Sequence, residues 1–152
     1  MLVRSTVATL LCCAALTAGA DSAPPAQPLA TTKPFKVSAA AAQGPVFQMK
    51  SAVKGHGPDG DTTDVLLLRS KDGRAEMGVY EATASEQDIE SYEVDEFMFF
   101  LAGGVKLTSA DGSVLEVKAG EGVAMPKGWK GHWSTTGYKK YYVTYNGAAK
   151  SK

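Results

Sequence analysis

The sequence predicts a single all-β domain whose strands close into a barrel of the jelly-roll type. Turn-forming Asp-Gly pairs separate apolar segments at Asp72-Gly73 and at Asp111-Gly112. Several flanking segments alternate apolar and polar residues, which is typical of a strand buried on one face. No window of helical length after residue 20 shows a 3.6-residue apolar period. We therefore expect roughly eight to ten short strands and at most one helical turn, at residues 82–87.

Residues 1–20 have the features of a secretory signal peptide. Arg4 precedes an apolar run at residues 7–18, and Ala18-Gly19-Ala20 gives the small-x-small cleavage pattern. Cleavage would remove both cysteines, Cys12 and Cys13, so the mature chain would have no disulfide. A leucine precedes Cys12, and this argues against an acyl anchor. We expect an exported protein, periplasmic or secreted, with no membrane attachment after cleavage.

Composition divides the rest of the chain into three parts. Residues 21–45 are rich in Ala, Pro and Thr and predict a flexible linker. Residues 46–145 form the predicted folded domain, and residues 146–152 a disordered tail. The 16 basic and 16 acidic side chains are interspersed, so no charged surface indicates nucleic acid as a partner.

The predicted strands follow the turns in order. Residues 46–49 are expected to form an edge strand, and Pro58-Asp59-Gly60-Asp61 the first turn. Residues 65–69 and 75–80 flank the first Asp-Gly pair, and residues 104–108 and 114–117 flank the second. Each Asp-Gly pair supplies the positive φ that a two-residue hairpin loop needs. Near the end, Tyr141, Val143 and Tyr145 share one strand face, with Tyr142 and Thr144 on the other.

The stretch from Tyr92 to Trp133 organises the domain. An acidic segment leads into an apolar run that we expect to stop at Gly103-Gly104. Glu96 and Gly103 have the spacing of the second half of the first cupin motif, and Gly120, Pro126 and Gly128 match the second motif. The chain therefore resembles the cupin superfamily. Within that superfamily, the amino-acid sequence of this stretch resembles the (S)-ureidoglycine aminohydrolase-like cupins. This resemblance implies the cupin double-stranded β-helix.

The resemblance also implies metal ligands, which are two histidines and the Glu of the first motif and one histidine of the second. Here the histidine positions hold Glu90 and Tyr92, or Ile89 and Ser91, and then Gly131. Only Glu96 is retained, because strand alternation directs His132 outward and His56 is expected in a loop. We predict no histidine metal site and no cofactor. A divalent cation on Glu90, Tyr92 and Glu96 stays open as an alternative.

The predicted site is the barrel interior around Glu96. A carboxyl group in apolar surroundings is a candidate general acid or base; alternatively, Glu96 forms a structural hydrogen bond with Tyr92 or a backbone amide. The predicted ligand-binding residues are Tyr92, Met98, Phe100, Met125, Trp133, Tyr141 and Tyr145.

Three hypotheses follow. The first is a barrel that binds a small polar or carboxylated molecule without turning it over. The second, implied by the resemblance, is an aminohydrolase or isomerase acting on a ureide or sugar-like substrate, with Glu96 as acid or base. The third is a module whose edge strand at residues 46–49 pairs with another chain, for example as a homodimer.

Overall fold

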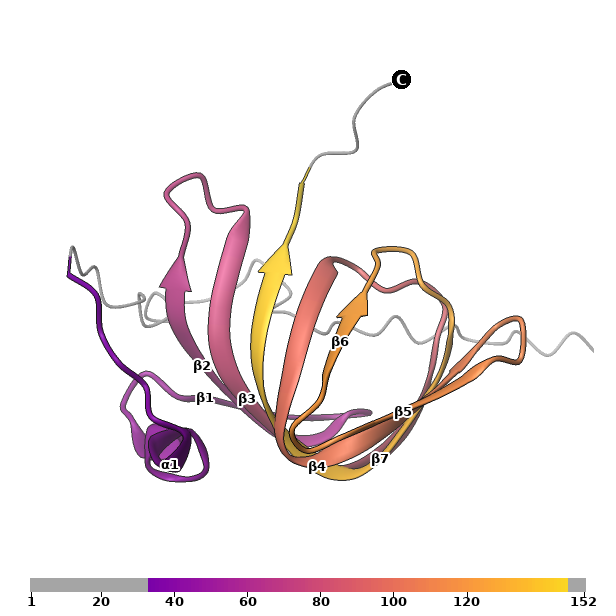
Figure 1. Ribbon diagram of the computed structural model, residues 1–152, viewed down its shortest axis with the longest axis horizontal. Helices are drawn as coiled ribbons and strands as arrows, with labels where there is room; N and C mark the ends of the chain where they lie inside the picture. The colour runs from indigo at the N-terminus through magenta and orange to yellow at the C-terminus, as the bar shows by residue number, and fades with distance from the viewer. Residues whose placement is uncertain (1–32, 148–152) are drawn as a thin grey trace, which may run out of the picture.

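The computed structural model describes residues 33–147, which form one antiparallel sheet of seven strands preceded by two short helical turns (Figure 1). The elements are α1 (Ala39–Ala42), the 3-10 helix η1 (Pro45–Gln48), β1 (Val53–Gly57), β2 (Gly60–Arg69), β3 (Ala75–Ile89), β4 (Asp95–Ser109), β5 (Val114–Lys118), β6 (Gly122–Met125) and β7 (Gly131–Tyr145). The strand order is β1-β2-β3-β7-β4-β5, and β6 pairs with β4. The predicted signal peptide, residues 21–32 of the predicted linker and residues 148–152 of the predicted tail lie outside the described residues. Neither helix of residues 33–147 is long and apolar enough to cross a membrane.

Three long strands replace the many short strands that the sequence suggested. β3, β4 and β7 each contain 15 residues and curve together, so that the sheet has the shape of a U (Figure 1). The expectation of eight to ten strands was wrong because the chain bends within its strands rather than between them. Gly103-Gly104 likewise bends β4 instead of ending it.

The bend occurs where two glycines meet across neighbouring strands. Gly103 in β4 has φ 65° and Gly137 in β7 has φ 113°, values that favour glycine. A Cβ atom on Gly103 would lie 1.9 Å from the carbonyl oxygen of Gly137. The two backbones therefore approach as closely as they do only because this position carries no side chain.

The alternation of buried residues shifts by one position at this bend. In β4 the buried side chains are Glu96, Met98 and Phe100 before the bend and Val105 and Leu107 after it. In β7 they are Trp133 and Thr135 before the bend, and Tyr138, Lys140, Tyr142 and Thr144 after it. A strict period of two along β7 therefore assigns the wrong face to every residue after Gly137.

The predicted turns are present. Gly73 and Gly112 have φ 71° and 85° and lie in the β2–β3 and β4–β5 connections. The β2–β3 connection covers residues 70–74, and so it is longer than a two-residue hairpin loop. Pro58-Asp59 forms the shorter connection, since β1 ends at Gly57 and β2 begins at Gly60.

The segment before β1 packs on the convex side of the sheet. Ala42, Val46 and Phe47 form a small core with Val65 and Val79. Residues 45–48 are therefore helical rather than an edge strand, and Pro45 occupies the first turn of η1, where its missing N–H is harmless. The packed region also begins before residue 46, because α1 lies inside the predicted linker. Residues 82–87 belong to β3 and form no helical turn.

A second and larger core fills the concave side of the U. It contains Met98, Phe100, Leu107, Trp133 and Tyr138 among its members. Glu96, which matched the first cupin motif, is buried on this side, and the candidate site lies there.

Candidate functional site

A buried ion pair occupies the concave face. Lys140 of β7 lies between Phe100 of β4 and Tyr80 of β3 in the sheet register. Its Nζ atom is 2.7 Å from Oε1 of Glu96, and the two side chains are 5% and 6% exposed. The hydroxyl of Tyr92 donates a hydrogen bond to the other carboxylate oxygen, Oε2. Both oxygens of Glu96 therefore have a partner.

Aromatic rings and a thioether surround the ammonium group. Nζ of Lys140 lies 5.3, 5.7 and 6.0 Å from the ring centroids of Tyr80, Tyr138 and Tyr142. It also lies 3.0 Å from Sδ of Met98. Ring faces attract a cation, and this attraction together with the Glu96 carboxylate offsets the cost of removing the ammonium from water. Contacts within the protein therefore replace water around the buried ion pair.

Acidic residues extend from this pair toward the half-buried edge of the concave face. The Tyr142 hydroxyl donates to Oδ1 of Asp64 at 2.9 Å, and the Tyr80 hydroxyl donates to Oδ2 of Asp59 at 3.1 Å. Burial raises the pKa of Asp64, and the nearby Glu76 and Glu96 carboxylates act in the same direction. The hydrogen bond from Tyr142 and the charge of Lys140 oppose this effect on the pKa without cancelling it.

Six of the sequence-predicted site residues meet on the concave face. They are Tyr92, Glu96, Met98, Phe100, Met125 and Trp133, all of them buried. Tyr92 donates a hydrogen bond to Glu96, as expected if Glu96 has a structural role. The expectation that Glu96 lies in apolar surroundings was wrong, because an ammonium nitrogen contacts it.

Tyr141 and Tyr145 are not part of this face. Tyr141 packs against the small core on the convex side, and its hydroxyl donates to the carbonyl oxygen of Val37 at 3.4 Å. Tyr145 is 47% exposed. Both predictions failed because the alternation along β7 shifts at Gly137, so Tyr142 and Thr144 face inward instead.

The sequence prediction missed the charged and aromatic residues that surround Glu96 and the half-buried edge of this face, which are Lys140, Asp64, Tyr80, Tyr138 and Tyr142. The signal for those on β7 is the pairing of Tyr142 with Thr144 on one strand face, which Lys140 shares. Lys140 follows Lys139, whose ammonium lies on the convex side, 5.3 Å from the Phe47 ring centroid. The two lysines follow the same bend, and the face of β7 on which each one lies decides its role.

The position of the second-motif histidine, Gly131, has no room for a side chain. A Cβ atom on Gly131 would lie 2.3 Å from the carbonyl oxygen of Thr108 and 2.6 Å from Cζ2 of Trp129. Trp129 packs against the inner core and donates from Nε1 to Oγ of Ser109 at 3.1 Å. The indole ring therefore lies over the place where a histidine side chain would start.

Both histidines are engaged at the surface. His132 is 40% exposed, with Nδ1 2.7 Å from Oδ1 of Asp88, which confirms the expected outward direction. His56 pairs with Asp61 and is also exposed, but it lies on β1 and not in a loop.

The donors on this face do not fit a cupin metal. Glu96 is bonded to Lys140 and Tyr92, and Glu90 is exposed. Within residues 33–147 no group of three or more His, Cys, Asp or Glu side chains has an arrangement that could hold a metal ion. A cation at Glu96 would have to displace the ammonium group of Lys140.

The EutQ-like cupin domain family matches residues 69–142. The folded domain belongs to the cupin superfamily. The matched segment includes β3, β4 and most of β7, the strands that carry Glu96 and Lys140. A comparison with curated proteins gives no significant match.

Solved cupin structures resemble this domain in fold. A DUF861-family protein of unknown function from Pseudomonas syringae pv. tomato DC3000 is 22% identical, with a TM-score of 0.57 over 61% of this chain and 43% of that chain. A protein of unknown function from Rhizobium leguminosarum bv. viciae 3841 is 23% identical, with a TM-score of 0.53 over 76% of this chain and 100% of that chain. A putative ethanolamine utilization protein Q from Salmonella typhimurium LT2 is 21% identical, with a TM-score of 0.50 over 60% and 77%. The cupin chain thus spans less than half of the Pseudomonas protein, and at these identities the likeness concerns the fold alone.

Proposed function

We propose that this cupin is an exported binding protein that takes a small polar molecule on its concave face without using a metal. The observation that carries this proposal is the buried Lys140–Glu96 pair. The carboxylate that matches the metal-ligating Glu of other cupins already has an internal cation 2.7 Å away. A protein with this arrangement retains the barrel but has no carboxylate free to coordinate an ion at that point.

The half-buried edge of the concave face indicates the class of ligand. Tyr80 offers a ring face there, and Asp64 offers a carboxyl group beside it. The Tyr142 hydroxyl donates to Oδ1 of Asp64, so the other carboxylate oxygen, Oδ2, is the one that can accept a bond from a ligand. Hydroxyl and amino groups suit these acceptors. A carboxylated ligand would meet Asp64 and Glu76, while the charge of Lys140 is already paired with Glu96.

A ligand screen tests the binding role. Thermal shift would be measured with polyols, amines and carboxylates of similar size, on the wild type and on Asp64→Ala, with Asp111→Ala as the matched control. Asp111 is an exposed aspartate in the β4–β5 turn. We expect polyols or amines to raise the melting temperature of the wild type and of Asp111→Ala, and not that of Asp64→Ala. Binding confined to carboxylates, or no shift with any compound, would argue against the proposal.

Export is a separate part of the proposal and rests on residues 1–20. The matching experiment is the mass of the protein recovered from the periplasm or medium after expression of the full chain. Cleavage after Ala20 predicts a mature protein that begins at Asp21. A full-length chain that stays with the cytoplasmic fraction would contradict export and leave the binding proposal intact.

An enzyme remains the alternative, supported by the chain of contacts Lys140–Glu96–Tyr92. An ammonium group and a phenol that each contact the same carboxylate can exchange a proton with it during acid–base catalysis. In this hypothesis Glu96 is the acid or base of an aminohydrolase or isomerase that acts on a ureide or sugar-like substrate. Glu96→Gln abolishes turnover if the hypothesis holds, and unchanged turnover in that variant would remove it.

A further inference from the structure

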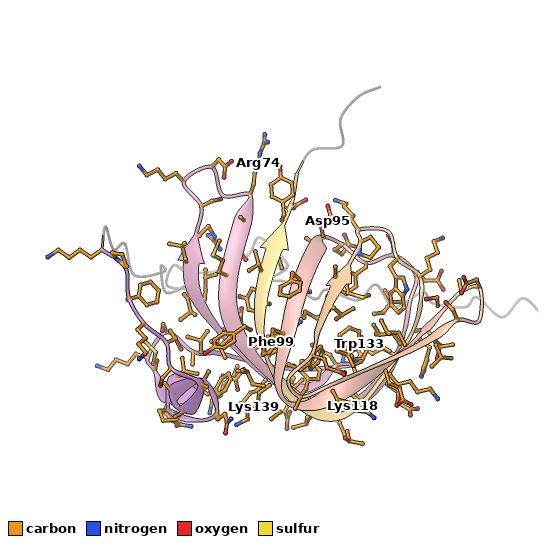
Figure 2. All side chains as sticks on the ribbon, in the orientation of Figure 1. Arg74, Asp95, Phe99, Lys118, Trp133 and Lys139 are labelled. Atoms are coloured by element: carbon orange, nitrogen blue, oxygen red, sulfur yellow. The ribbon has the colours of Figure 1, made fainter. Side chains whose placement is uncertain are left out.

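A cavity of about 490 Å³, here called the outer cavity, opens at the bend of the sheet, where β2, β3, β4 and β7 all contribute to its lining. Figure 2 shows Lys139, one of the lining residues, at the base of the U between α1 and β4. The charged and hydroxyl-bearing side chains of the lining are Asp61, Thr63, Glu81, Thr83, Thr136 and Lys139. Small-molecule sites commonly have volumes of about 300–1,000 Å³, so this cavity has the size and the polarity for a small polar ligand.

The outer cavity exists because of the shift of alternation in β7. Thr135 and Tyr138 are both buried, so the two residues between them, Thr136 and Gly137, fall together on the outer side and line the cavity. Gly137 has no side chain to fill this space, and Gly103 beside it has no room for one. Alanines of β3 and β4 complete this floor. The floor therefore accommodates alkyl groups, while the walls are polar.

Both signs of charge line the walls of the outer cavity. Thr63, Glu81 and Lys139 are successive cross-strand partners on β2, β3 and β7. Nζ of Lys139 is 3.3 Å from Oε2 of Glu81, and the two side chains are 31% and 29% exposed. Nζ also donates to the carbonyl oxygen of Gln43 at the end of α1. An ammonium group has three N–H donors, so one of them can point to a ligand.

Asp61 and Thr63 place further acceptors beside Glu81. They are two residues apart on β2, so their side chains share one face of the strand. Glu81 is the direct partner of Thr63, and long side chains reach their diagonal neighbours across a strand pair. His56 contacts Oδ1 of Asp61, and Lys139 contacts Oε2 of Glu81. The remaining oxygens, Oδ2 and Oε1, are the ones that can accept bonds from a ligand.

The Thr63 hydroxyl is a buried polar group that a ligand can satisfy. Thr63 is 8% exposed, and no hydrogen bond joins its hydroxyl to another residue of the described range 33–147. Every fully enclosed side-chain oxygen and nitrogen in this range does have a partner, so the Thr63 oxygen is open to the cavity that it lines. Burying a hydroxyl without a hydrogen bond costs free energy, and a ligand in the cavity would supply the missing bond.

We propose that the outer cavity binds a zwitterion, namely a free α-amino acid. The ammonium group of the ligand donates to the acceptors of Asp61, Glu81 and Thr63. The carboxylate of the ligand accepts from the Lys139 ammonium and from the Thr83 hydroxyl. That hydroxyl can donate, since its oxygen already accepts a bond from the backbone N–H of Asp61 at 2.9 Å. The alkyl part of the amino acid then lies on the floor of glycine and alanine.

The mixed charge of the walls selects against ligands of one sign. An amine would leave the donor of Lys139 without a carboxylate, and its own charge would be repelled by that ammonium group. A carboxylic acid would meet the carboxylates of Asp61 and Glu81. The proposal is separate from the ligand of the concave face, because Lys139 and Lys140 lie on opposite faces of β7.

The first test is calorimetric titration of the purified full chain with the standard L-amino acids. For the amino acid that binds most tightly, we expect the amine without its carboxylate and the acid without its amino group to bind at least about tenfold more weakly, because each loses hydrogen bonds between charged groups. An amine or acid that binds as tightly as the amino acid would overturn the proposal, and so would the absence of binding by every amino acid.

Thr63→Val tests the buried hydroxyl, because it removes the oxygen and keeps the shape of the side chain. Affinity for the amino acid should fall about tenfold or more, while Thr63→Ser should retain it. Thr62→Val is the matched control, since Thr62 faces the other side of β2 as the partner of Ala82, a residue of the concave core. Circular dichroism checks that the variants are folded. Equal affinity of Thr63→Val and the wild type would contradict the assigned site.

Lys139→Met tests the charge selection. The variant keeps an unbranched stem against the Phe47 ring and leaves only carboxylates as charged groups on the walls. Its preference should therefore change from the amino acid to the matching amine; an unchanged preference would show that Lys139 does not hold the ligand carboxylate. Asp64→Ala, on the concave face, should bind the amino acid as the wild type does. Loss of binding in Asp64→Ala would assign the amino acid to the concave face and overturn this proposal, while the binding role proposed for that face would stand.

Discussion

The ammonium group of Lys140 lies 2.7 Å from the Glu96 carboxylate on the concave face of the barrel. Glu96 matches the cupin motif in spacing, and Lys140 is contributed by the strand next to it. The charge that a metal would otherwise neutralise is therefore neutralised by a side chain of the protein. The family fold is retained, while the donors needed for metal chemistry are replaced by a salt bridge, a phenol and three tyrosine rings.

Removing one partner of this pair should cost more than removing both. Lys140→Met leaves the Glu96 carboxylate buried without a cation, and breaking a buried pair in this way costs about 3–5 kcal/mol. Glu96→Gln leaves an unpaired ammonium, and the double variant Lys140→Met with Glu96→Gln leaves no buried charge. Urea unfolding of the four proteins gives the coupling free energy. We expect the double variant to be more stable than Lys140→Met; additive losses would show that the two charges are not coupled.

Gly103 should tolerate no side chain. In Gly103→Ala the new Cβ atom would lie 1.9 Å from the Gly137 carbonyl oxygen, so the bend of the sheet must open. The matched control is Gly112→Ala, since Gly112 also has a positive φ but nothing within 4 Å of the added atom. Backbone strain alone costs about 1–2 kcal/mol. We expect the control to lose that amount and Gly103→Ala to lose clearly more, or to fail to fold; equal losses would contradict the close approach.

The pH dependence of stability should change when Asp64 cannot ionise. Burial raises the pKa of Asp64 above its usual 3.8, so the folded state holds this proton more tightly than the unfolded chain does. The stability that results is fully present below pH 3.8 and is lost as the pH rises through the folded-state pKa. Asp64→Asn keeps an acceptor for Tyr142 and avoids that loss.

Urea unfolding of the wild type and Asp64→Asn across this range provides the measurement. The stability of the variant relative to the wild type should increase from acid to neutral pH, by about 1.4 kcal/mol for each unit by which the pKa is raised. A relative stability that does not change with pH, or that moves in the other direction, would show that burial does not govern this carboxyl group.

Gly131 should be intolerant of substitution although it lies at the position of a metal ligand in other cupins. Gly131→Ala would place a methyl group 2.3 Å from the Thr108 carbonyl oxygen and 2.6 Å from Trp129. Such crowding costs about 1–3 kcal/mol and should change the fluorescence of Trp129. Gly44→Ala is the control, because nothing lies within 4 Å of its added atom. A stable Gly131→His variant that acquires a bound metal would contradict this account of the position.

The turns and the fold family could be predicted from sequence because they depend on local backbone chemistry. Gly73 and Gly112 adopt the positive φ that an Asp-Gly pair predicts. Gly120, Pro126 and Gly128 carry the spacing of a cupin motif, and the family match confirms that superfamily. The finer resemblance to ureidoglycine aminohydrolase-like cupins stays a prediction.

The composition of the site could not be predicted in the same way, because it depends on one shift of alternation. Trp133 faces inward on both interpretations, but the shift at Gly137 directs Lys140 and Tyr142 inward and Tyr141 outward. Glycines mark bends, yet the sequence does not show whether a bend changes the facing of the residues that follow. The partner of Glu96 is 44 residues away in the chain, and only the pairing of β4 with β7 brings it near.

The most direct test of the central claim is the metal content of the full-length cupin purified without chelator, measured by elemental analysis on the wild type, Lys140→Met and Glu96→Gln. If the ammonium group of Lys140 holds the place of a cation, the wild type contains no stoichiometric manganese, iron, zinc or nickel. Stoichiometric metal in the wild type that is lost in Glu96→Gln would contradict the claim.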